Sequence, residues 1–146
     1  MNSTVNIREI TLNDAEDIQM IRKRISEDDA HVDFKKIIKQ NVDEKNTQSC
    51  LVAEMDSRVV GYMISTILYA GFGLKKSAWI MSIGVDPAFM GQGIGLKLAR
   101  EICRIYKEKG VEYLYSSVLW DSIDVLSFFK KLGFERSQFI NLRKKL

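Results

Sequence analysis

The spacing of apolar residues along the chain predicts an alternation of strands and helices. Segments that alternate apolar with polar residues, or are rich in β-forming residues, lie at 5–10, 50–55, 59–69, 79–85, 111–119 and 134–142. Segments with apolar residues at helical spacing lie at 15–25, 32–41, 94–109 and 123–132. The resulting order, β-α-α-β-β-β-α-β-α-β, predicts an α/β fold with one central, mostly antiparallel sheet.

One strand-to-helix junction carries three alternate glycines, Gly91, Gly93 and Gly95. A residue without Cβ allows positive φ and a close approach of the backbone to a ligand. Because helical spacing begins at Ile94, the glycines lie at a helix N-terminus, where unpaired N–H groups and the helix dipole favour phosphate. A tight connection without any ligand would explain these glycines equally well.

The spacing of these glycines excludes the two standard phosphate loops. The dinucleotide fingerprint G-x-G-x-x-G would need glycine at position 96 or 98, and the chain has Leu96 and Leu98 there. The Walker A loop needs Gly-Lys followed by Ser or Thr, which the sequence lacks.

Composition narrows the classes of function. With 146 residues and 46% hydrophobic content, the chain is expected to form a single domain, residues 1–146. A net charge of +3 is too small to favour nucleic acid as a partner. Short apolar runs and an N-terminus unlike a signal peptide predict no membrane span and a cytoplasmic protein. Cys50 and Cys103 lack metal-ligand spacing, so no metal site is expected.

Two motifs resemble those of the GNAT superfamily of N-acetyltransferases. Gly93 and Gly95 fill the two small positions of the acetyl-CoA signature [Q/R]-x-x-G-x-[G/A], while Met90 stands where Gln or Arg is usual. Residues 128–134, FFKKLGF, resemble the C-terminal signature L-Y-x-x-x-G-F. The resemblance covers nearly the whole chain. It implies a GNAT-like fold in which about four helices flank a single mixed, mostly antiparallel sheet.

The resemblance implies acetyl-CoA as cofactor and transfer of its acetyl group to a primary amine by direct attack in a ternary complex. The amine would be a small molecule or a protein or peptide N-terminus. A homodimer is a possibility that the sequence leaves open. An acyl-CoA-binding sensor or interaction module with little catalysis is the alternative. It is motivated by strand 79–85, which has no carboxylate, and by Phe129, which stands where the family commonly has a tyrosine acid.

The resemblance also implies site residues. The backbone N–H of Val85 would stabilise the oxyanion. Ser82, Tyr115 and Asp121 are candidates for proton transfer, with Glu54 and Asp124 as other carboxylates, although packing or capping explains each of these side chains as well. The residues implied at the cofactor are Ile83, Gly84, Val85, Met90, Gly91, Gln92, Gly93, Ile94, Gly95, Leu96, Ser122 and Phe129.

The acceptor is expected near the loop between the first two helices. Glu27 and Asp28 would attract a cationic amine, and His31, the sole histidine, would order it. A solvated acidic turn with an exposed histidine is the ordinary alternative.

Overall fold

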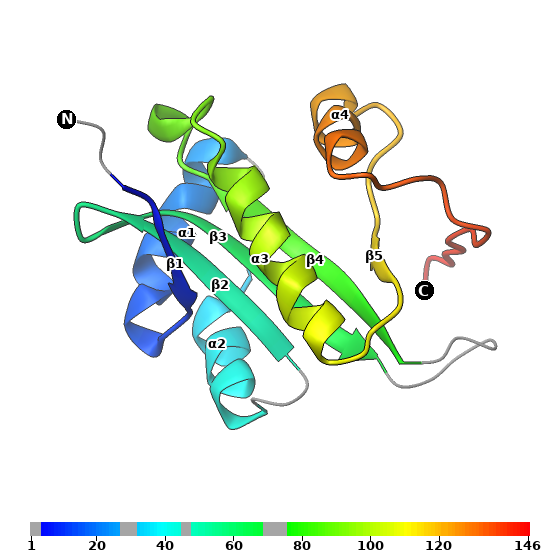
Figure 1. Cartoon of the computed structure of the whole chain (residues 1–146), viewed down its shortest axis with the longest axis horizontal. Helices are drawn as coiled ribbons and strands as arrows, with labels where there is room; N and C mark the ends of the chain where they lie inside the picture. Colours follow the sequence, from blue (N-terminus) through cyan, green and yellow to red (C-terminus); the bar gives the residue numbers. More distant parts are fainter. Residues whose placement is uncertain (1–3, 27–31, 45–47, 69–75) are drawn as a thin grey trace.

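The computed structural model describes residues 4–26, 32–44, 48–68 and 76–146. These residues form a sheet with the strands β1 (Asn6–Glu9), β2 (Gln48–Met55), β3 (Arg58–Leu68), β4 (Ser77–Val85) and β5 (Leu114–Ser116). The helices are α1 (Ala15–Ile25), α2 (Phe34–Asp43), α3 (Ile94–Glu108) and α4 (Ile123–Lys131), with short 3-10 turns η1 (Leu12–Asp14) and η2 (Pro87–Phe89). Figure 1 shows these elements along the chain.

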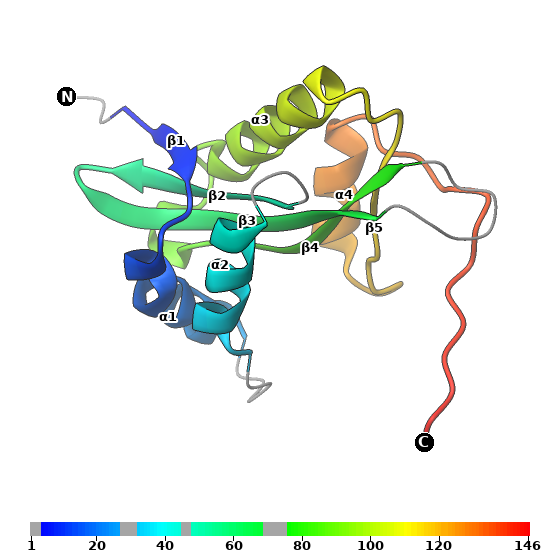
Figure 2. The same ribbon diagram turned by 90° about the horizontal axis from the view of Figure 1, so that it is seen from below.

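The strands lie in the order β1-β2-β3-β4-β5, antiparallel from β1 to β4 and parallel between β4 and β5. In Figure 2 the sheet separates α1 and α2 from α3. The apolar stripe of α3, from Ile94 through Leu98 and Ile102 to Tyr106, packs on one face in a core that includes Met63. Ile18, Ile21, Phe34 and Ile38 of α1 and α2 form a second core on the other face. The predicted α/β fold with a mixed sheet is confirmed.

Two predicted strands differ from the structure. The strand expected at 111–119 is only Leu114–Ser116, because β4 pairs with no more than these three residues. The strand expected at 134–142 is absent, and the chain after Gly133 has no regular structure. The run from Glu135 to Gln138 is wholly polar, so the segment lacks an apolar face to hold it on the sheet.

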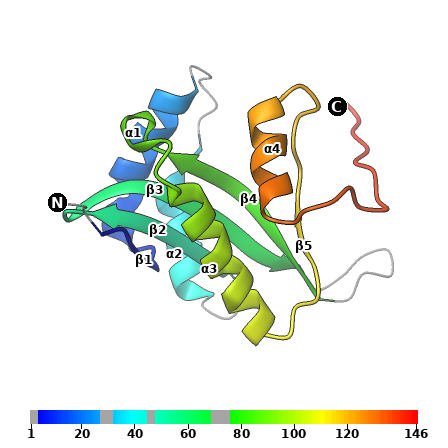
Figure 3. The same ribbon diagram turned by 45° about the horizontal axis from the view of Figure 1, so that its top comes forward.

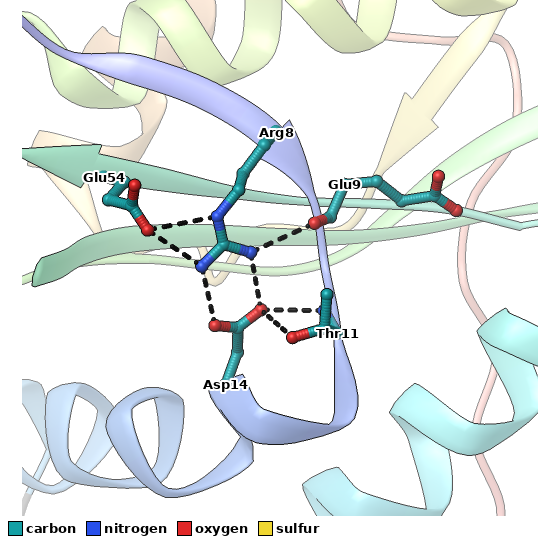
Figure 4. A network of polar contacts seen from close by, with 5 residues as sticks. All are labelled: Arg8, Glu9, Thr11, Asp14 and Glu54. Carbon is teal, nitrogen blue, oxygen red and sulfur yellow. Dashed lines mark hydrogen bonds and ion pairs between the residues drawn. The ribbon is translucent and has the colours of Figure 1, made fainter. Parts of the chain in front are cut away.

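A polar network ties β1, η1 and β2 together (Figure 4). The Arg8 guanidinium donates to both carboxylate oxygens of Asp14, at 2.9 and 2.8 Å, and to Glu54 Oε2 at 3.0 and 3.1 Å. Asp14 also accepts from the backbone N–H of Thr11 at 2.7 Å, which closes a capping box. Glu54, one of the candidate carboxylates, is therefore engaged in an ion pair at the β1 edge of the sheet.

The Arg8 network predicts a pH-dependent loss of stability. Burial alone would raise the pKa of Asp14, but the hydrogen bonds and charges of Arg8 and Thr11 outweigh it and lower that pKa. A pKa that is lower in the folded state stabilises the fold above the unfolded value of about 4, and this stabilisation is lost as pH falls through the folded pKa. Asp14→Asn should therefore lower the free energy of unfolding by about 2 kcal/mol at pH 7.

Urea titrations of both proteins at neutral and acidic pH measure this difference. The two free energies of unfolding should converge as the pH falls below about 4. A gap that stays the same at every pH would show that the charge of Asp14 contributes nothing.

Candidate active site

The strands β4 and β5 pair over three residues and then separate. Ile80 with Ser116 is the last pair, and the Ser116 hydroxyl donates to the Ile80 carbonyl at 3.3 Å. At the same point β4 contains a bulge, because Ser82 pairs with Ile64 and Ile80 with Ser65, which leaves Met81 without a partner on β3. Figure 3 shows β4 running toward α3 while the chain after β5 turns away to α4. Within the described chain, the outer edge of β4 is therefore unpaired from Met81 onward.

Backbone groups of β4 point into this open edge. The N–H of Asp86 donates to the Val60 carbonyl of β3 at 2.8 Å. Because successive N–H groups of a strand point to opposite sides, those of Val85 and Ile83 face away from β3. Two of the residues implied at the cofactor thus present backbone donors and acceptors at the open edge.

Gly84 is placed differently from its neighbours. It pairs with Tyr62 of β3, and a Cβ on Gly84 would lie 2.6 Å from the Tyr62 ring and 2.9 Å from Ile25. The Gly84 backbone pairs with β3, and the absence of a side chain makes room for the Tyr62 ring. Close packing therefore requires glycine at this position.

The glycine loop joins β4 to α3. Gly91 and Gly93 have φ of +82° and +75°, the left-handed conformation that favours glycine, and a Cβ on either would meet no atom within 4 Å. The first hydrogen bond of α3 runs from Lys97 N to Gly93 O at 3.0 Å. The N–H groups of Ile94, Gly95 and Leu96 precede that bond and form the N-terminal donors of the helix.

Of the other loop residues implied at the cofactor, Met90 and Gln92 face solvent, whereas Gly95 packs against α4. Gln92 and Met90 are exposed, so the methionine that replaces the usual Gln or Arg lies in solvent. A Cβ on Gly95 would lie 3.0 Å from the Phe128 ring of α4. The third glycine is therefore needed for the approach of α4 to α3.

Ser82 lies on β4 itself, two residues after the last pair with β5. It is half-buried, and its hydroxyl lies 3.2 Å from the hydroxyl of Tyr62, whose ring belongs to the core beneath α1 and α2. Tyr62 could not be identified from the sequence, because nothing there distinguishes it from a packing tyrosine in a strand.

The remaining candidate side chains lie on β5 and α4. Tyr115 stacks on Trp79, its pairing partner on β4, with 4.8 Å between ring centroids and 22° between ring planes. Its ring therefore packs over the short paired part of β4 and β5. Asp121 is exposed just before α4, and Ser122 is the N-cap of α4 without a side-chain capping bond. Phe129 is only 6% exposed and packs against Phe128 and Phe134 in the core.

Several residues named from the sequence are not part of this site. Glu27, Asp28 and His31 lie outside the described residues. Cys50 is buried, which raises its thiol pKa to about 11, whereas Cys103 is exposed. Among the described residues, no group of three or more His, Cys, Asp or Glu side chains gathers as for a metal ion, and no helix has the length and apolarity to cross a membrane.

A separate hollow of about 420 Å³ lies between α1 and α2. Its lining comes from these helices and the residues before α2: Ala15, Glu16, Gln19, Lys23, Val32, Asp33, Phe34 and Lys35. Because β4, the glycine loop and α3 contribute nothing to it, this hollow is not part of the site built around the open edge.

The fold is similar to that of solved acetyltransferases. An aminoglycoside acetyltransferase from an uncultured soil metagenomic sample, solved with trehalose, has a TM-score of 0.79 and 22% identity, with 97% of this chain and 96% of that chain covered. Aminoglycoside N-acetyltransferase AAC(6')-Iy, solved with CoA, has a TM-score of 0.80 and 19% identity, with 99% and 97% covered. The model of the acetyltransferase (GNAT) family matches residues 12–134, most of the chain. This protein therefore belongs to the GNAT family of acetyltransferases, whose cosubstrate is acetyl-CoA.

Proposed function

We propose that this protein transfers the acetyl group of acetyl-CoA directly to a primary amine while both are bound. The observation that carries the proposal is the unpaired outer edge of β4, which leads straight into the glycine loop. Backbone groups of Ile83 and Val85 and the N-terminal donors of α3 lie in sequence along one path. Such a path suits a long cofactor that ends in a pyrophosphate.

The residues of the glycine loop fit the anionic part of coenzyme A. Positive φ at Gly91 and Gly93, with open space where their side chains would be, exposes the backbone to a ligand. The N–H groups of Ile94, Gly95 and Leu96 add the positive end of the α3 dipole. We assign the pyrophosphate to these groups and the pantetheine arm to the backbone of Ile83 and Val85.

Acetyl-CoA supplies an acetyl group that is activated as a thioester, with the coenzyme A thiol as the leaving group. As the amine attacks, negative charge develops on the acetyl oxygen, and we assign its stabilisation to the Val85 N–H. A thiol with a pKa near 8.5 can leave as thiolate at a cost of about 2 kcal/mol at neutral pH, so the chain can act without an acid in place of Phe129.

The proton on the amine sets a preference among acceptors. β4 carries no carboxylate, and Glu54 is paired with Arg8. Deprotonating an α-amine of pKa about 8 costs about 1 kcal/mol at pH 7, whereas deprotonating a lysine amine of pKa about 10.4 costs about 4.6 kcal/mol. We propose that water ordered by the hydroxyls of Ser82 and Tyr62 relays the proton to bulk solvent, which favours amines of low pKa.

A small-molecule amine is the acceptor class that we favour. The support is the fold shared with enzymes named as aminoglycoside acetyltransferases, one of them solved with sisomicin. A polypeptide N-terminus has the low amine pKa and stays the alternative acceptor. A homodimer and a cytoplasmic location stay predictions from the sequence.

Calorimetry with acetyl-CoA, followed by a thiol-release assay over a panel of small amines and peptides, tests the proposal. We expect saturable binding and release that needs both acetyl-CoA and one class of amine. Absence of binding at high micromolar acetyl-CoA would refute the assignment of the cofactor site. Binding without turnover on any amine would instead favour the sensor or interaction module.

A further inference from the structure

Asp86 is a buried carboxylate at the junction between β4 and the glycine loop. Its side chain is 2% exposed. One carboxylate oxygen accepts from the backbone N–H of Ala88 at 3.0 Å, and the other accepts from Arg24 at 2.6 Å and from Arg58 at 3.4 Å. A single side chain therefore joins the end of β4 to η2, to α1 and to β3.

The two arginines bind Asp86 unequally. Arg24 comes from the last turn of α1 and makes the shorter contact. Arg58 makes the longer contact at 3.4 Å, is 56% exposed and lies over the Phe89 ring at 5.4 Å. Because a buried charge is costly without a partner, Arg24 is the main compensation for the Asp86 carboxylate.

These contacts set the path of the chain into the glycine loop. The Asp86 carboxylate caps η2, and the Asp86 carbonyl accepts from Phe89 N at 2.8 Å. η2 ends at Phe89, two residues before Gly91. The start of the loop is thus attached to α1 and β3 by side chains from elsewhere in the chain, and not by its own backbone bonds alone.

The sign of the charge determines what Asp86 can do. A carboxylate repels a pyrophosphate, so Asp86 cannot hold coenzyme A by direct contact. Arg24 is paired with Asp86 at 2.6 Å, so it is not free to bind the pyrophosphate in its place. A contribution of Asp86 to cofactor binding must therefore act through the shape of the loop.

We infer that Asp86, held by Arg24, is a positioning residue that keeps the loop from Gly91 to Gly95 in its binding shape before coenzyme A arrives. This inference rests on the assignment of the loop under the proposed function. Donors that are already ordered bind a ligand more tightly, because the entropy cost of ordering them is not subtracted from the binding free energy.

Asp86→Asn is the first test, since an amide oxygen can still cap Ala88 while the charge for Arg24 is lost. We expect the dissociation constant for coenzyme A, measured by calorimetry, to rise about tenfold in this variant and in Arg24→Gln. Because both changes break one pair, the double variant should bind no more weakly than Asp86→Asn alone. Arg24→Lys, which keeps the charge, should recover part of the affinity.

The matched control is Arg104→Gln on α3. Arg104 is 54% exposed and pairs with Glu101 at 2.5 Å and Glu108 at 2.7 Å, so this change also breaks arginine ion pairs. Coenzyme A affinity should stay unchanged in the control, because these pairs lie on the solvent side of the helix.

A second readout needs no cofactor. Amide hydrogen exchange over residues 90–96 of the cofactor-free protein should be several-fold faster in Asp86→Asn than in the parent protein, and unchanged in Arg104→Gln. Lower melting temperatures with unchanged affinity and unchanged exchange would overturn the inference, because the pair would then be merely structural. A further loss of affinity when Arg24→Gln is added to Asp86→Asn would overturn it too, since Arg24 would then bind the cofactor directly.

Failure of the proposed function can be distinguished from failure of the inference about Asp86. If the parent protein did not bind coenzyme A, the assignment of the cofactor site would be wrong. The exchange rates of the cofactor-free protein would still decide whether Asp86 holds the loop.

Discussion

Replacing Gly93 with valine is expected to weaken coenzyme A binding about a hundredfold or more, as measured by calorimetry. Gly93 has φ of +75° at the N-cap of α3, a conformation that a β-branched residue adopts only with strain of about 1–3 kcal/mol. Relief of that strain would move the loop N–H groups. A valine side chain that stayed in place would occupy the open space assigned to the pyrophosphate.

Gly110→Val is the matched control for this prediction. Gly110 follows the other end of α3, has φ of +76°, and a Cβ there would also meet no atom within 4 Å. The two substitutions should therefore lower stability by similar amounts. Only Gly93→Val should lose coenzyme A, and equal affinities in the two variants would show that the loop glycines serve the turn alone.

Replacing Val85 with proline is expected to lower kcat about 10²–10³-fold on the amine that the thiol-release panel identifies. Proline removes the N–H assigned to the developing oxyanion. It is tolerated where that N–H points away from the neighbouring strand, as the Asp86 bond to Val60 indicates for Val85. Coenzyme A affinity should change by less than tenfold, since Val85→Pro removes only one of the backbone groups assigned to the pantetheine arm and leaves the loop, the Ile83 backbone and the Val85 carbonyl in place.

Val85→Ala controls for the loss of the side chain, because it keeps the N–H. Its kcat should stay within about threefold of the parent value if the backbone donor is the functional group. A Val85→Pro protein that is folded, binds coenzyme A and turns over at the parent rate would remove Val85 from the mechanism.

The helices, most of the strands and the glycine loop could be predicted from local sequence. Helical spacing from Ile94 and the alternate glycines depend only on residues within a few turns of one another, and the structure confirms α3 and positive φ at Gly91 and Gly93. The family could be predicted as well, because two short motifs at a suitable distance carry its signature.

The two strand predictions that were wrong depended on strand pairing as well as on composition. Residues 134–142 have strand-like composition at both ends, but a strand also needs a partner, and β5 pairs over only three residues. Gly95 also has a packing role that local sequence does not show, because its missing Cβ makes room for Phe128. The ion pair of Glu54 with Arg8, 46 residues away, likewise depends on the pairing of β1 with β2 and could not be predicted from local sequence.

The sequence by itself predicted an anion-binding loop, since glycines at a helix N-terminus favour that chemistry wherever the helix lies. The tertiary structure decided what surrounds the loop. The bulge at Met81 and the separation of β4 from β5 leave Val85 with a backbone donor at an open edge, and the packing of α1 brings Arg24 to Asp86. The hydrophobic periodicity of a sequence depends only on residues that are close together along the chain. An unpaired strand edge and a long-range ion pair depend on how whole helices and strands pack.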